Sequence, residues 1–142
     1  MKKIIFLSLI ISLIIGGCNQ VKKSRIEGAW QLVYSHWPPI DGIFPTQIKG
    51  GSIKIWSMEY FATVGRFEMD TVIYDTHVGG TYKLEGNRYQ ETIHFNPSKG
   101  TTDYIVRLIL ELRNDTLIQR WPADENWNLD EKFSTEKYVR LK

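Results

Sequence analysis

The sequence predicts an all-β protein: an eight-stranded antiparallel up-and-down β-barrel that follows an N-terminal secretion signal. Three observations carry this prediction. Short runs of alternating apolar and polar residues recur, turn-forming residues separate them, and no long stretch has the period of a helix. Eight antiparallel strands can close on themselves, which removes exposed sheet edges and leaves an interior for side chains or one small ligand.

The N-terminal segment has the composition of an export signal. Lys2 and Lys3 precede an apolar run from Ile4 to Gly17, which is shorter than the roughly 20 residues that a membrane-spanning helix needs. The only cysteine of the chain, Cys18, follows this run directly. Cleavage near this point by an ordinary signal peptidase, with Cys18 as a passenger, is the alternative to a role for the cysteine itself.

The run Ile15-Gly16-Gly17-Cys18 resembles the lipobox of bacterial lipoproteins. The resemblance implies that residues 1–17 are a lipoprotein signal peptide and that Cys18 carries acyl chains that hold the protein to membrane lipid. Residues 18–25 then form the lipidated cysteine and a polar, flexible tether, and residues 26–142 form the barrel domain. Asn19 is not the aspartate that favours inner-membrane retention, so we expect the periplasmic face of the outer membrane.

The strands of the barrel follow in order along the chain. Short turns at Glu85-Gly86-Asn87 and Asn114-Asp115 favour hairpins, because glycine and asparagine tolerate positive φ. Alternation is clearest from Tyr104 to Leu112, where one parity is entirely apolar and is predicted to face the core. A β-sandwich is the structural alternative. The predicted strands are 28–35, 52–56, 60–67, 80–84, 88–95, 104–112, 116–121 and 133–141.

Composition excludes several classes of function. Without residues 1–17 the chain loses two of its 18 basic residues and keeps all 16 acidic ones, so its formal net charge is zero. A balanced chain lacks the basic face that nucleic-acid binding requires. We predict no enzyme, metal or cofactor, because the histidines are widely separated and no nucleophile or phosphate-loop motif is present.

The first predicted strand begins with Gly28-Ala29-Trp30, which resembles the Gly-x-Trp opening of lipocalin-like (calycin-type) barrels. The resemblance implies that Gly28 lets the chain enter the strand tightly and that Trp30 plugs the closed end beneath a stacked arginine, here Arg140. The segments 80–84 and 86–93 are similar to small lipocalin-like domain proteins and lipoproteins of Bacteroides-type bacteria. The chain lacks the long C-terminal helix and the disulfides of larger lipocalins.

Two segments supply candidate ligand contacts. Trp37, Ile40 and Phe44 lie in a proline-stiffened connection that either covers a ligand at the mouth or fills the mouth itself. In the strand 88–95, alternation places Tyr89, Glu91, Ile93 and Phe95 on the interior face. An inward Glu91 requires a partner, for example Arg66, or a ligand group; a bulge that turns it to solvent is the alternative.

Two functions remain at this point. The first is an envelope-anchored carrier that binds a small apolar or amphipathic molecule inside the barrel. The second is a barrel filled by its own aromatic side chains, which uses its outer face or loops to bind another envelope protein. An internal cavity of a few hundred cubic ångströms favours the carrier.

Overall fold

The computed structural model describes residues 24–97, 100 and 103–142, and leaves the side chain of Ile40 undescribed. The predicted signal peptide, Cys18 and most of the predicted tether therefore lie outside the described residues. The described chain forms nine strands and one short 3-10 turn, η1 (Pro38–Ile40), and no α-helix. The strands are β1 (Gly28–Trp37), β2 (Gly42–Phe44), β3 (Lys49–Ser57), β4 (Tyr60–Met69), β5 (Val72–Glu85), β6 (Arg88–Phe95), β7 (Tyr104–Arg113), β8 (Thr116–Ala123) and β9 (Leu129–Arg140).

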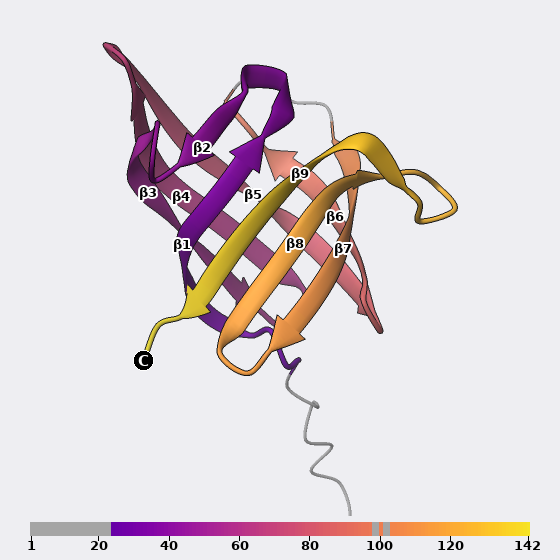
Figure 1. The fold of residues 1–142 in the computed structure, drawn as a ribbon. Helices are drawn as coiled ribbons and strands as arrows, with labels where there is room; N and C mark the ends of the chain where they lie inside the picture. The colour runs from indigo at the N-terminus through magenta and orange to yellow at the C-terminus, as the bar shows by residue number, and fades with distance from the viewer. Residues whose placement is uncertain (1–23, 98–99, 101–102) are drawn as a thin grey trace, which may run out of the picture.

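The strands close into an antiparallel up-and-down barrel, as the sequence predicted. Neighbours pair in the order β1-β3-β4-β5-β6-β7-β8-β9, and β9 pairs back onto β1. Figure 1 shows the closure, with yellow β9 lying beside indigo β1. The additional strand β2, which the sequence did not predict, pairs only with the end of β1 and extends one rim of the barrel.

One end of the barrel is closed by the residues that precede β1. Ile26 is buried, and the indole nitrogen of Trp30 donates a hydrogen bond to its carbonyl oxygen at 2.8 Å. Arg25 donates to the carbonyl oxygen of Gly86 in the turn between β5 and β6. The described chain therefore begins at the closed end, while the connection through η1 and β2 lies at the opposite end, which is the mouth (Figure 1).

The eight predicted strands are present at the predicted positions, but most of them extend further than predicted and one contains a bulge. β5 begins at Val72 rather than Gly80, because it pairs with the full length of β4 in a long hairpin. β6 contains a bulge at its mouth end, where Gly79 and Gly80 pair with Phe95 and Ile93 and leave His94 as the extra residue. Gly80 permits the close approach of β6, since a Cβ there would lie 2.0 Å from the carbonyl oxygen of Thr92.

The lower half of the barrel, next to the closed end, is packed with aromatic side chains. Trp30 and Tyr89 are fully buried, and Trp56 lies between them with edge-to-face ring contacts. Tyr138 completes this layer from β9 and contacts Trp56 edge-on at 6.4 Å between ring centroids. Such pairs contribute about 0.5–1.5 kcal/mol each beyond the burial of their surface.

Candidate functional site

The upper half of the barrel interior holds a cavity of about 580 Å³ that opens at the mouth. This volume lies within the roughly 300–1,000 Å³ range of small-molecule pockets. Its walls near the mouth are largely apolar or aromatic, and its floor is polar. The lining residues are Trp37, Pro39, Lys54, Phe61, Thr63, Thr76, Val78, Glu91, Ile93, Asn96, Tyr104, Val106, Leu108, Gln119, Trp121, Ser134, Glu136 and Tyr138.

The floor of the cavity contains a buried ion pair. Lys54 of β3 donates to Glu91 of β6 at 2.5 Å, and its ammonium also lies 3.4 Å from Oε1 of Gln119. Both partners of the pair are almost completely buried. The Lys54 nitrogen lies over the rings of Trp56, Phe61 and Tyr89 at 5.2–5.7 Å, so cation–π attraction adds to the ion pair.

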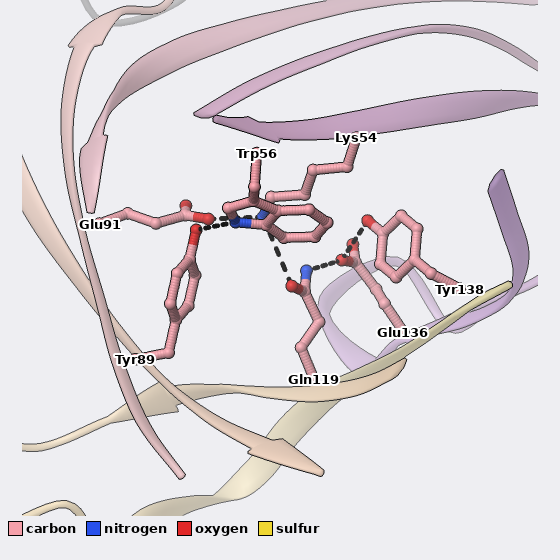
Figure 2. Close-up of polar contacts among 7 residues, drawn as sticks. All are labelled: Lys54, Trp56, Tyr89, Glu91, Gln119, Glu136 and Tyr138. Atoms are coloured by element: carbon pink, nitrogen blue, oxygen red, sulfur yellow. Dashed lines mark hydrogen bonds and ion pairs between the residues drawn. The ribbon is translucent and has the colours of Figure 1, made fainter. Parts of the chain in front are cut away.

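A second carboxylate, that of Glu136 on β9, lies across the floor from this pair (Figure 2). It accepts hydrogen bonds from three neutral donors: the Nε2 of Gln119, the hydroxyl of Tyr138 at 2.8 Å and the indole nitrogen of Trp37 at 3.1 Å. Gln119 faces Glu136 in the register of β8 and β9, which explains the direct contact. The amide of Gln119 thereby links the Lys54–Glu91 pair to Glu136.

Two tyrosines beneath the floor are held in their neutral forms. Burial is the largest cause that raises the pKa of Tyr138 well above its usual value, and the negative charge of Glu136 adds to it. Burial, followed by the charge of Glu91, likewise raises the pKa of Tyr89. Both phenols therefore remain hydrogen-bond donors at physiological pH. Each therefore keeps its proton close to a carboxylate.

The residues predicted to cover or fill the mouth do not all line the cavity. Trp37 lines the cavity at the mouth, and its indole nitrogen donates a hydrogen bond to Glu136. Phe44 is buried against the ring of Phe67 and does not line the cavity. Trp37 also contacts Phe67 edge-on, at 5.4 Å between ring centroids. The η1 and β2 connection therefore both covers and partly fills the rim. Ile40 was predicted to join them, but its side chain is outside the described part of the structure.

The predicted interior face of β6 is right for three of its four residues. Tyr89 is buried in the aromatic layer below the cavity, and Glu91 and Ile93 line the cavity. Phe95 is 72% exposed, so the prediction that it faces the interior was wrong. The bulge before Phe95 is the physical reason, because the extra residue breaks the strict alternation of the strand.

The ion-pair partner of Glu91 is Lys54, not Arg66, which the sequence had offered as an example. Arg66 lies on the outer surface of β4, where it forms an exposed ion pair with Asp75 at 2.6 Å. Lys54 takes the interior position instead. The sequence around it, Ile53-Lys54-Ile55, suggests an apolar core face formed by the two isoleucines, yet Ile55 is 44% exposed. The signal that identifies Lys54 is its shared parity with Trp56, a buried tryptophan two residues later.

Gln119 and Glu136 were missed for a related reason. Both are polar residues in predicted strands, where polarity normally indicates a solvent-facing side chain. Their interior position follows from their parity with buried neighbours, Leu117 in β8 and Tyr138 in β9. A buried polar or charged side chain thus appears in sequence only as a break in an apolar face.

The closed end has the arrangement that the Gly-x-Trp resemblance implies. The guanidinium of Arg140 lies 4.1 Å from the ring centre of Trp30, and the two residues are paired in the register of β1 and β9. Arg140 also donates to the carbonyl oxygens of Glu27 and Arg25. Gly28 has φ +122°, and a Cβ there would lie 3.1 Å from an Arg140 nitrogen, so a larger residue would crowd the guanidinium.

Two further observations concern chemistry and membranes. Within the described ranges, no group of three or more His, Cys, Asp or Glu side chains is arranged to hold a metal ion. Across the same residues, no helix has the length and apolar character needed to cross a bilayer.

The fold and the cavity define a class: a closed antiparallel barrel with one packed end and one open, internally lined end. Comparison with protein-family models and with curated protein sequences gives no match for the chain.

Proposed function

We propose that this protein is a lipocalin-like carrier that binds a small amphipathic molecule inside its barrel and is anchored to the bacterial envelope through Cys18. The observation that supports it most directly is the cavity of about 580 Å³ with apolar upper walls and a polar floor. A ligand with one polar end and an apolar body matches this gradient when the polar end enters first. The stacking of Arg140 over Trp30 supports the lipocalin-like assignment.

The proposed anchor has a geometric consequence for the barrel. The described chain begins at Ser24 beside the closed end, and six residue steps (18 to 24) separate it from Cys18. An extended chain covers at most about 3.6 Å per residue, so the tether reaches no further than about 22 Å. The closed end is then held near the membrane while the mouth faces away from it, and the ligand is exchanged with the aqueous side.

Native mass spectrometry of the protein isolated from its own cells, in the form those cells process, tests ligand binding. Two variants sharpen the measurement. Val106 lines the cavity, so Val106→Trp fills it, whereas Ile105 is exposed on the opposite face of the same strand and Ile105→Trp leaves the cavity open. We expect an extra mass, lost on denaturation, in the native protein and in Ile105→Trp but not in Val106→Trp. Bare protein in all three would overturn the carrier proposal and favour a protein-binding module.

The anchor is tested independently by metabolic labelling with palmitate. Cys18→Ala should abolish labelling, because the thiolate that accepts the diacylglycerol is gone, while Asn19→Ala should retain it. Labelling that persists in Cys18→Ala would show that the chain carries no lipid at this position.

A further inference from the structure

The ionisable side chains that line the cavity do not balance in charge. Lys54 is the only cation among the lining residues, and Glu91 and Glu136 are two anions. Lys54 and Glu91 neutralise one another in their short ion pair. The carboxylate of Glu136 is left, in the described part of the chain, with neutral donors only. A buried carboxylate is costly unless a cation or several hydrogen bonds compensate it.

The hydrogen-bonding capacity of Glu136 is not exhausted. An ionised carboxylate has about four acceptor positions, two on each oxygen. Gln119 and Tyr138 both donate to Oε2, whereas Oε1 accepts only from Trp37. One acceptor position therefore remains on Oε1, the oxygen that accepts the hydrogen bond from Trp37 at the mouth.

A second, independent polar group lines the same cavity from the same strand. Ser134 is two residues before Glu136 on the same face of β9, one step nearer the mouth, and it lines the cavity. It is only 3% exposed. A serine hydroxyl on the wall of a cavity can both donate a hydrogen bond to a bound group and accept one from it.

From these contacts we propose that the carried ligand is an amphipathic cation, an aliphatic amine with an ammonium head. Its head binds Oε1 of Glu136 and the hydroxyl of Ser134, and its apolar body lies against the apolar lining residues Ile93, Val106 and Trp121. The inference rests on the proposed carrier function and specifies its ligand. An ammonium supplies several donors and the missing positive charge, and charge-assisted hydrogen bonds are roughly twice as strong as neutral ones.

The same site disfavours a fatty acid. The one cation of the cavity, Lys54, is already paired with Glu91 and surrounded by three aromatic rings. An incoming carboxylate would meet the unbalanced charge of Glu136 with no free cation to receive it. An alcohol of the same length has no charge, so its affinity measures the contribution of the apolar wall alone.

The test compares decylamine, decanol and decanoate, which share an alkyl chain and differ in charge. Each competes with the neutral dye N-phenylnaphthylamine for the processed protein, and the fluorescence of Trp37 and Trp121, which line the cavity, provides a second signal. We expect decylamine to bind at least about tenfold more tightly than decanoate, equivalent to about 1.4 kcal/mol. Glu136→Gln should remove this preference, and Ser134→Ala should weaken only the amine.

Glu68→Gln is the matched control, because it makes the same chemical change on an exposed position of β4. It should leave the preference unchanged. If decanol and the dye bind but decanoate equals or exceeds decylamine, the cationic-ligand inference is refuted while the carrier proposal stands. If none of the three ligands nor the dye binds, the carrier proposal itself fails. The order of affinities in the unaltered protein decides the question even where a variant does not fold.

Discussion

Replacing Trp30 with alanine tests whether the closed end of the barrel is held by its tryptophan. The side chain is 0% exposed, its indole nitrogen donates to Ile26, and the guanidinium of Arg140 stacks on its ring. Deletion of a buried tryptophan or phenylalanine side chain costs about 3–5 kcal/mol through lost transfer energy and the remaining void. We expect the upper part of this range, because the substitution also removes the support that the ring gives to Arg140.

A loss of this size is a large fraction of the roughly 5–15 kcal/mol by which small domains are stable. Urea denaturation followed by tryptophan fluorescence gives the free energy of unfolding, since four tryptophans remain of the five in the chain. Tyr60→Ala is the matched control: it removes an aromatic ring from a β4 position that is 60% exposed, and it should cost less than about 1 kcal/mol. A loss below about 1 kcal/mol for Trp30→Ala would refute the role of this residue as the plug.

Two further predictions concern the polar floor. Lys54→Met should lower the free energy of unfolding by about 3 kcal/mol in urea denaturation, because it leaves Glu91 buried without its cation, and the double variant Lys54→Met/Glu91→Met should recover most of that loss. An equal or larger loss in the double variant would contradict this account. The raised pKa values of Tyr89 and Tyr138 predict that stability is fully present below about pH 10 and falls as pH rises above it, because unfolding releases phenols that ionise at their ordinary pKa. Urea denaturation across this pH range should show a shallower decline in Tyr138→Phe than in the unaltered protein.

The barrel could be predicted from sequence because its strands obey a local rule. In β7, side chains of one parity are apolar from Tyr104 to Leu112, and this face is the one that the structure turns inward. Hairpin turns with glycine or asparagine then set the order of neighbours. The extra strand β2 escaped prediction, because only three residues pair there and their pairing depends on the path of the chain after η1.

The candidate site was only partly predictable, and the reason is again physical. Glu91 was identified because a single acid interrupted an otherwise apolar face. Parity places Lys54 inside with Trp56 and Arg66 outside, opposite to Phe67. The contact between Lys54 and Glu91, which lie on strands that are not neighbours, is tertiary information that a local pattern does not contain. The outward position of Phe95 was not predicted, because the bulge in β6 shifts the alternation of side chains by one residue.

The sequence left open a hollow barrel that binds a ligand and a barrel filled by its own aromatic side chains. In the structure, each description fits one half of the barrel. The lower half is filled, because Trp30, Trp56, Tyr89 and Tyr138 meet across the axis with edge-to-face contacts. The upper half is hollow and holds the cavity of about 580 Å³. Lys54, Glu91, Gln119 and Glu136 lie at the boundary between the halves. The aromatic layer below stabilises the lysine through its ring faces. The charged and polar groups of the floor line the cavity that opens at the mouth. The same packing that makes the barrel stable therefore sets the depth to which a ligand can enter and the charge that it meets there.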